Sequence, residues 1–318
     1  LPPSQRPTTH PKAMQMHFIG TGSMVPTRNR GTSCLLLRMS KEVWMFDCGE
    51  GTQTKLQLST TKLPNLSKIF ITHLHGDHIF GLPGLLCGLG AARTEVRQDK
   101  NTTKTPPPVV DIYGPVGLRQ FLRTCAQSSY SRFADYVVHE IKDIPQMYPN
   151  GKKKAKQGTH LTSCDPSTNS ARAGECQGGT LISPGEDGFW HLFEREDGMV
   201  VRAAPVCHTV PTLGYTVQEP PLTGKLNMPL LQPYLDENMH LFGPDQPETH
   251  NRKFPNFIQH LKHVAGTAPE STLTLPNATI IAAKDFVGAT KPGKQVGWGC
   301  ACAWGGVCVC QESCCGCG

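Results

Sequence analysis

The segment Ile69-Phe-Ile-Thr-His-Leu-His-Gly-Asp-His78 constrains this chain more than any other part of its sequence. Its first three residues form an apolar run that predicts a buried strand ending in polar residues. His73 and His75 lie two positions apart, so an extended backbone points both imidazoles to the same side. The glycine that follows allows a turn, and Asp77 and His78 then open a segment that predicts a short helix. Imidazole and carboxylate groups held at a strand-to-loop junction favour a metal site.

Composition places the chain among globular proteins. Of its 318 residues, 38% are hydrophobic and 18% are charged, and the length allows one large domain or two ordinary ones. No run of about 18 apolar residues occurs, so we expect no membrane span. The net charge of +6 has the sign of a nucleic-acid-binding protein but is small. Residues 1–15 carry neither an initial methionine nor an apolar signal segment, and we expect a disordered N-terminal extension there.

Cysteine usage indicates the compartment. Seven of the fourteen cysteines are scattered singly over residues 1–295, without the regular spacing of a disulfide framework. This pattern favours a reducing environment, the cytoplasm or the nucleus, and leaves an organelle open. The other seven cysteines lie within the last nineteen residues.

Two other predicted strand ends carry residues that a metal site would use. A strand over residues 42–46 ends in Asp47, and a strand over residues 199–206 is followed by His208. Alone, His208 would be an ordinary histidine, but beside a three-histidine cluster it is the first candidate for a further ligand. Arg28 and Arg30 follow a glycine-rich turn, where their guanidinium groups either grip a phosphate or are simply solvated.

The alternation of strands and helices predicts a layered α/β core over residues 16–219. Residues 146–188 carry a lysine run and are otherwise rich in Gly, Ser and Thr, so we expect a disordered surface insertion. Its lysines are interpreted as a solvated patch, with RNA contact as the less favoured alternative. Residues 220–292 are rich in Pro, Asn, Gln and His, and they predict a protruding subdomain with one helix near 256–264 and a short strand over 278–282.

Several of these segments resemble tRNase Z, the tRNA 3′-processing endonuclease of the metallo-β-lactamase superfamily, in its short form. The resemblance covers roughly residues 16–295 without the 146–188 insertion. The segments that carry it are Phe18–Gly22, Phe46–Gln53, Ile69–Leu86, Ile112–Leu118, His208 with Pro211–Tyr215, and Thr223–Leu226.

The resemblance implies an αββα sandwich that holds two zinc ions. By motif position, His73, His75 and His208 would bind the first zinc, and Asp77 and His78 the second. Asp77 would also act as general base on the attacking water. Two zinc ions lower the pKa of bound water and stabilise charge on phosphorus, so a phosphodiester bond is hydrolysed near neutral pH. The product would be a tRNA with a 3′-hydroxyl.

The resemblance also assigns supporting roles. Asp47 would orient a ligand histidine. Arg28 and Arg30 lie where the family has a loop that senses the tRNA 3′ end. Gly224 and Lys225 would open a flexible arm, residues 220–292, that grips the tRNA elbow. The implied partners are precursor tRNA and a second copy of the chain in a homodimer.

After Gln295 the resemblance ends. The family continues with a Gly-Asp whose carboxylate bridges both zincs, a His-Glu-Ala-Thr stretch and a late Thr-His, and none of these follows here. Residues 296–318 instead form a Cys/Gly-rich, non-homologous tail without helical or strand patterning. The tail is either a metal-binding cysteine cluster or, as we favour, translation past a splice or frame boundary. We therefore expect an incomplete C-terminal portion, one well-held zinc and weak or absent activity.

Two other functions remain open from the sequence. One is another hydrolase of the same superfamily, of the thioesterase, lactonase or arylsulfatase type, which would act on nitrocefin or acyl-glutathione esters but not on RNA. The other is a non-catalytic tRNA-binding product, whose salt-dependent binding would survive chelation.

Overall fold

The computed structural model describes residues 14–39, 42–61, 63–98, 108–147, 163, 165, 174–238, 254–267 and 270–299. The chain divides into two compact units, and each is described by itself. The first contains the described residues up to Phe193, together with Val201–Val217 and the residues from Val296. The second contains Glu194–Val200 and Gln218–Gln295.

The first unit is built on an eight-stranded sheet with the order β2-β1-β3-β4-β5-β6-β7-β8. From β4 to β8 every neighbouring pair is parallel, whereas β3 runs antiparallel to both β1 and β4. The strand β4 is apolar on both faces, and β5 ends in the buried pair Ile69 and Phe70, as parallel strands covered on two sides require. The strands are β1 (Gln15–Gly22), β2 (Gly31–Thr32), β3 (Cys34–Arg38), β4 (Val43–Phe46), β5 (Leu66–Phe70), β6 (Val110–Pro115), β7 (Tyr136–Ile141) and β8 (Leu181–Ile182).

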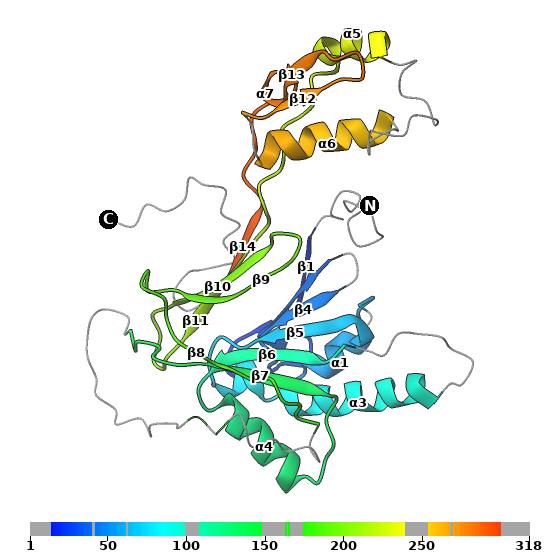
Figure 1. Ribbon diagram of the computed structural model, residues 1–318. Coiled ribbons are helices and arrows are strands. Elements are labelled where there is room, and N and C mark those ends of the chain that lie inside the picture. Colours follow the sequence, from blue (N-terminus) through cyan, green and yellow to red (C-terminus); the bar gives the residue numbers. More distant parts are fainter. Residues whose placement is uncertain are drawn as a thin grey trace. The chain divides into compact units, whose positions relative to one another are not determined.

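Helices cover one face of this sheet (Figure 1). The inward side chains of the parallel strands, among them Met45, Ile69 and Ile112, form one buried core with leucines of the helices such as Leu86 and Leu122. These strand residues are register partners, so they lie side by side on the same face. The helices are α1 (Thr52–Gln57), the 3-10 turn η2 (Leu63–Asn65), α2 (Gly76–Ile79), α3 (Leu82–Gln98) and α4 (Leu118–Ser128).

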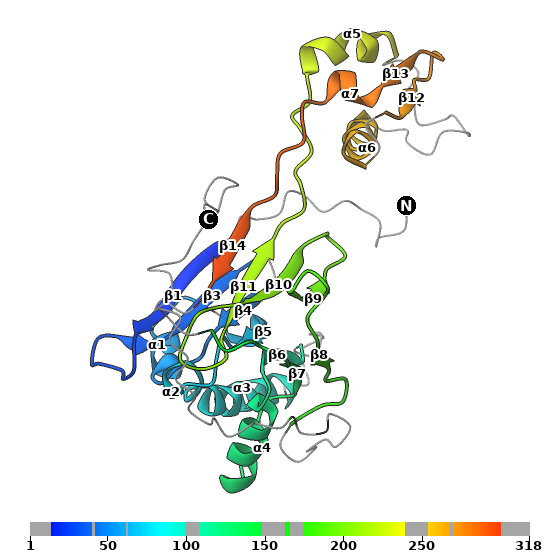
Figure 2. The same cartoon turned by 90° about the vertical axis from the view of Figure 1, so that its left-hand side faces the viewer.

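A second, four-stranded sheet with the order β14-β11-β10-β9 covers the opposite face (Figure 2). Aromatic rings fill the space between the sheets. The Phe70 ring stacks on Phe46 at 4.8 Å and on Tyr113 at 5.2 Å, and it meets Phe193 and Tyr215 of the second sheet at 6.4 and 5.3 Å. The strands are β9 (Trp190–Glu194), β10 (Val200–Pro205), β11 (Leu213–Gln218) and β14 (Gln295–Trp298).

The predicted α/β class is confirmed. The described part of the first unit contains three of the four layers expected for an αββα sandwich: a helix layer and two sheets (Figure 2). The described helices of this unit all belong to the layer on the large sheet.

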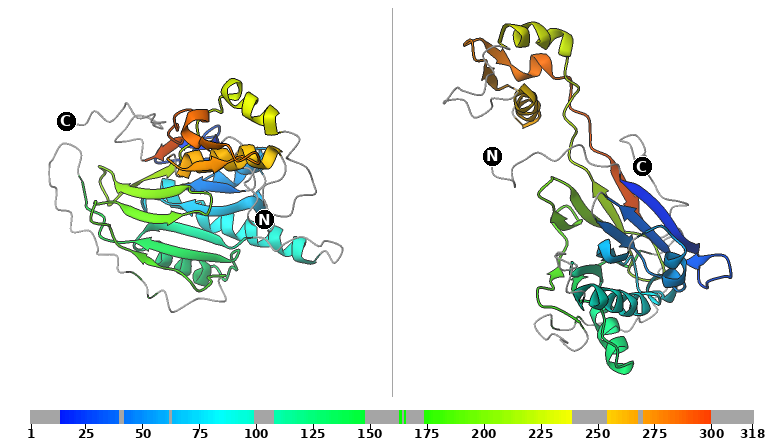
Figure 3. Two further views of the ribbon diagram at one scale, coloured as in Figure 1. Left: turned by 45° about the horizontal axis from the view of Figure 1, so that its top comes forward. Right: turned by 90° about the vertical axis from the view of Figure 1, so that its right-hand side faces the viewer.

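The second unit, whose ribbon is drawn in Figure 3, has a core of its own. Leu231 and Leu235 of α5 pack with Phe257 and Leu261 of α6 and with Phe286 of α7. Its elements are α5 (Met228–Asn238), α6 (Phe254–Thr267), β12 (Thr272–Thr274), β13 (Ile280–Ala282) and α7 (Ala283–Phe286). The sequence predicted α6 and β13 but not α5, because Pro233 inside this helix argues against a helical prediction.

The prediction of disorder over 146–188 is wrong for residues 174–188. Here Glu175 forms a bridge with Tyr136 at the start of β7, and β8 pairs in parallel with the end of that strand. The Glu175 carboxylate also binds the buried guanidinium groups of Arg119 and Arg123 at 3.1 and 2.6 Å. A low-complexity composition does not reveal such long-range ion pairs. Residues 148–162, 164 and 166–173 lie outside the described residues.

The prediction that the chain has no strand pattern after residue 295 is also wrong at its start. Residues 295–298 form β14, which neighbours β11 in the second sheet. Backbone pairing needs only a donor and an acceptor on each residue, so a short edge strand forms even with a glycine in it. Residues 1–13 and 300–318, which include most of the predicted extension and tail, lie outside the described residues. None of the described helices is long and apolar enough to cross a membrane.

Candidate metal centre

The site lies where two neighbouring parallel strands end. Phe46 and Phe70, the last residues of β4 and β5, are register partners. The carboxyl ends of parallel strands meet at one edge of a sheet, so the residues that follow come together there. Asp47 donates its backbone N–H to the Phe70 carbonyl at 2.8 Å and has a positive φ of 58°, which turns the chain away from β4. The loop after β5 leads directly to His73.

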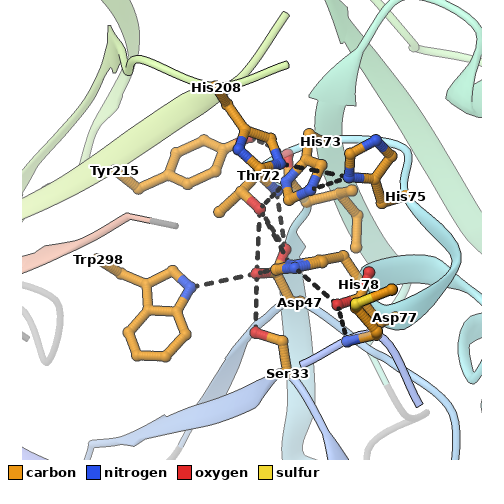
Figure 4. A network of polar contacts seen from close by, with 12 residues as sticks. Ser33, Asp47, Thr72, His73, His75, Asp77, His78, His208, Tyr215 and Trp298 are labelled. Atoms are coloured by element: carbon orange, nitrogen blue, oxygen red, sulfur yellow. Dashed lines mark hydrogen bonds and ion pairs between the residues drawn. The ribbon is translucent and has the colours of Figure 1, made fainter. Parts of the chain in front are cut away.

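Three imidazoles converge at this edge (Figure 4). His73 Nε2 lies 3.0 Å from His75 Nδ1, and His208 Nε2 lies 3.3 Å from the same atom. One nitrogen from each of the three rings lies within 4.8 Å of the other two. His73 and His75 come from the loop after β5, whereas His208 comes from the loop after β10. The backbone N–H of His208 is held by the Met147 carbonyl at 2.7 Å.

The spacing of these nitrogens suits one metal ion. A tetrahedral zinc with Zn–N bonds of about 2.0–2.1 Å places its nitrogen ligands about 3.4 Å apart, close to the spacings observed. Burial, followed by the nearby imidazoles, lowers the pKa of His73 to about 2. Burial is also the first cause of the lowered pKa values of His75 and His208. All three rings are therefore neutral near pH 7, the form in which an imidazole binds a metal.

Asp47 lies behind this cluster and is hydrogen-bonded to His78. It is fully buried. Its Oδ1 accepts the Thr72 backbone N–H at 2.8 Å and the Thr72 hydroxyl at 3.0 Å. Its Oδ2 accepts from His78 Nδ1 at 2.7 Å, from the Ser33 hydroxyl at 3.2 Å and from Trp298 Nε1 at 3.3 Å. A carboxylate with so many donors is fixed in position.

His78 presents a second donor pair together with Asp77. Its Nδ1 is occupied by Asp47, so its Nε2 is directed outward and lies 3.6 Å from Asp77 Oδ2. Burial lowers the pKa of His78, but the charge and hydrogen bond of Asp47 outweigh it, and the pKa is raised overall. Asp77 Oδ2 also accepts the Met24 backbone N–H at 2.8 Å. This pair supplies one nitrogen and one carboxylate, which is fewer donors than the triad of His73, His75 and His208.

Two glycines allow the loops around the site to pack closely. A Cβ at Gly49 would collide with the Asp77 carbonyl, and one at Gly81 would collide with the Gly49 carbonyl. The same loops are joined by backbone hydrogen bonds of 2.8 Å from Cys48 to the His78 carbonyl and 2.9 Å from Gly81 to the Cys48 carbonyl. The segment after β4 and the helix α2 therefore hold each other in place.

The structure does not bring all predicted site residues to the histidine cluster. Arg28 and Arg30 are exposed and lie in a loop closed by a turn from Thr27 to Arg30. Gly224 and Lys225 belong to the second unit, where a Cβ at Gly224 would collide with the Gly288 carbonyl.

Sequence reasoning missed four contributors to the site. Thr72 contacts His73 Nδ1 at 3.0 Å and His78 Nδ1 at 3.4 Å besides Asp47, and its place directly before His73 was the available signal. No signal in the sequence pointed to Ser33, Met24 or Trp298, because each contacts the site across a long sequence separation.

Comparison with known proteins agrees with this geometry. A family profile described as "Anti-Pycsar protein Apyc1" matches residues 14–91. The zinc phosphodiesterase ELAC protein 1 of Homo sapiens is 40% identical over 216 residues, which cover 68% of this chain and 55% of the relative. A ribonuclease Z of Microcystis aeruginosa is 49% identical over 131 residues, covering 40% of this chain and 37% of that protein.

The 216 residues matched to the human protein are the longest of these three matches. A crystal structure of human tRNase Z, short form, is similar over 64% of this chain and 63% of that chain, with 36% identity and a TM-score of 0.46. The chain spans about half the length of the curated relatives that it matches, 55% for the human protein. The sequence identities with the zinc phosphodiesterase and the ribonuclease Z confirm the resemblance inferred from the sequence motifs.

Proposed function

We propose that this chain carries the catalytic site of a zinc-dependent endoribonuclease that removes the 3′ trailer from precursor tRNA. The observation that supports this most is the convergence of His73, His75 and His208 beside a second donor pair, in a chain homologous to tRNase Z. The name of the human relative, a zinc phosphodiesterase, matches both the donor set and the reaction.

The histidine triad would hold the first zinc, and Asp77 with His78 would hold a second. Zinc bound here would supply Lewis-acid stabilisation of a phosphoryl oxygen and a bound water of lowered pKa. Among the described residues, the triad is the one group of three or more donors with mutual spacing suited to a metal. A site with three imidazoles retains a metal better than one with two donors. We therefore expect the triad to have the higher affinity.

Other roles in the proposed reaction, namely proton transfer, orientation of a ligand and phosphate binding, fall to residues of the chain. The Asp77 carboxylate, in the first turn of α2, would take the proton from the attacking water. Asp47 fixes the tautomer of His78 by accepting its Nδ1–H, which leaves the Nε2 lone pair for a ligand bond. Arg28 and Arg30 would bind phosphates of the tRNA 3′ end, because planar guanidinium groups recognise phosphate oxygens in pairs.

The second unit would serve as the tRNA-binding arm. Gly224 and Lys225 stand at one of its ends, and its separate apolar core makes it a folded module rather than a loose loop. We further propose that the chain forms a homodimer and acts in the cytoplasm or nucleus. The proposed compartment rests on the cysteine spacing, which lacks the regularity of a disulfide framework. Light scattering and cell fractionation test these two points.

The deciding experiment is cleavage of an end-labelled precursor tRNA with zinc supplied and with chelator. We expect weak zinc-dependent cleavage after the discriminator base, because the second donor pair offers only two ligands, and we expect it to be lost in His73→Ala and Asp77→Ala. His191→Ala is the matched control, because His191 is half exposed and pairs with Asp187 elsewhere on the first unit. Binding of zinc without any cleavage would contradict a catalytic role. Activity on nitrocefin but not on RNA would assign the chain to another hydrolase class.

A further inference from the structure

We infer that Trp298 is a positioning residue of this site, which acts on His78 through a hydrogen bond from its indole N–H to Asp47. The inference rests on the proposed metal centre, but it concerns a contact that exists without the metal. Trp298 Nε1 lies 3.3 Å from Asp47 Oδ2, the same oxygen that accepts His78 Nδ1 at 2.7 Å (Figure 4).

The indole N–H of Trp298 needs a hydrogen-bond acceptor. An indole N–H only donates, so a partly buried tryptophan needs an acceptor within reach. The buried carboxylate of Asp47 supplies it. Trp298 is the last residue of β14, and its ring also contacts the half-exposed ring of Phe18 on β1, with centroids 6.4 Å apart and planes tilted by 53°. The ring therefore has a polar contact with Asp47 and an aromatic contact with Phe18.

The contact matters because the lone pairs of Asp47 Oδ2 are limited. Ser33, His78 and Trp298 all donate to this oxygen, and the Thr72 hydroxyl lies 3.0 Å from it. When the indole N–H and the Ser33 hydroxyl both donate to this oxygen, the Asp47 carboxylate cannot rotate toward another donor. The His78 ring then keeps one orientation, with Nε2 directed toward Asp77. Loss of the indole N–H frees the carboxylate to move and loosens the donor pair of His78 and Asp77.

A purely structural tryptophan would behave differently. Packing against Phe18 would then be its only contribution, and a phenylalanine would largely replace it. Trp298→Phe keeps an aromatic ring on Phe18 but removes the N–H. Phe18→Leu is the matched control, because it removes the ring contact and leaves the N–H and Asp47 intact.

The test measures zinc affinity by competition with a chromophoric chelator. The ratio of zinc to chain is varied so that binding at two sites is resolved. We expect Trp298→Phe to weaken the second zinc about tenfold, the usual size of the loss when a partner behind a ligand is removed. The first zinc, on the histidine triad, keeps its affinity. Phe18→Leu leaves both affinities unchanged. Equal affinities in Trp298→Phe and the unmodified chain, or equal losses in the two variants, would overturn the inference.

A second measurement is independent of zinc. The metal-free chain has four tryptophans, and the indole N–H signal that disappears in Trp298→Phe identifies Trp298 by nuclear magnetic resonance. We expect this signal to shift in Asp47→Asn, because its acceptor loses its charge, and to remain in place in Asp187→Asn. No shift in Asp47→Asn would refute the hydrogen bond itself. A chain that binds no zinc but shows the shift would instead refute the proposed metal centre.

Discussion

Asp77 Oδ2 accepts the backbone N–H of Met24 at 2.8 Å, so the segment that carries Asp77 and the segment before Arg28 and Arg30 are joined at a single carboxylate. Met24 has a positive φ of 65°, an unfavourable conformation for a residue with a side chain. Its side chain is exposed, so packing does not explain this conformation. The hydrogen bond to Asp77 provides a reason, since it fixes the direction of the Met24 N–H. The loop that carries the two arginines is therefore positioned by the proposed base.

Asp77→Asn separates the two roles of this carboxylate. The amide oxygen still accepts the Met24 N–H, but the side chain no longer takes a proton or binds a metal as an anion. We expect RNA cleavage to fall by about 10²–10⁴-fold, the range typical for loss of a general base, whereas the thermal midpoint stays unchanged. Single-turnover cleavage and a melting curve measure the two effects. A variant that cleaves normally would rule out Asp77 as the base.

Asp47→Ala tests the buried carboxylate that accepts hydrogen bonds from Thr72 and His78. The substitution leaves buried donors of Thr72 and His78 without an acceptor, and the loss of one partner from such a buried network costs about 3–5 kcal/mol. We expect the free energy of unfolding of the first unit to fall by that amount in a urea titration. The exposed Asp187, which also pairs with a histidine, is the control; its change to alanine is expected to stay within about 0.5 kcal/mol. A small loss at Asp47 would show that the network is not tightly coupled.

The sequence predicted more of this molecule than its composition alone would suggest, and the limits have physical causes. The predicted strand over 42–46 and the helix near 256–264 agree with β4 and α6, because local apolar patterns directly reflect which residues are buried. Asp47 and His208 were candidates because each follows the end of a predicted strand. By contrast, β8 pairs with the distant strand β7, Glu175 binds two arginines more than 50 positions away, and Trp298 contacts Asp47 across 251 positions. Local patterns carry no information on such pairings.

The metal-free protein is expected to lose stability on acidification below about pH 6.5. The pKa values of His73, His75 and His208 are lowered in the folded state, that of His73 to about 2, so below pH 6.5 the unfolded chain binds more protons at these groups. Their contribution is complete above pH 6.5 and declines as the pH falls. The raised pKa of His78 acts in the opposite sense, since its contribution is present at low pH and is lost as the pH rises through the folded value.

Three histidines have lowered pKa values and one has a raised value. We therefore expect the free energy of unfolding to be higher at pH 6.5 than at pH 5. Urea titrations in the presence of chelator at a series of pH values measure it. His73→Gln removes the largest of the lowered groups and is expected to flatten the curve in this window. Equal stability of the metal-free chain at pH 5 and pH 7 would contradict the prediction.

Gly81→Ala is expected to disturb the site without touching any proposed ligand. The added Cβ would collide with the Gly49 carbonyl, which is backbone and has little freedom to move. The loop after β4 and the start of α3 would then separate, and the hydrogen bond from the Gly81 N–H to the Cys48 carbonyl would lengthen. We expect a loss of about 1–3 kcal/mol in unfolding free energy, as for overpacking in a core, together with weaker zinc binding.

Gly84→Ala is the matched control for this change. It lies three residues further on, inside α3, where the added Cβ would meet only the flexible end of the Gln53 side chain at 3.2 Å. Alanine is favoured over glycine inside a helix by about 1 kcal/mol, so we expect this variant to be as stable as the unmodified chain or slightly more. Thermal melts and zinc titrations of both variants give the comparison. If both behave alike, the close approach of Gly81 to Gly49 does not shape the metal centre.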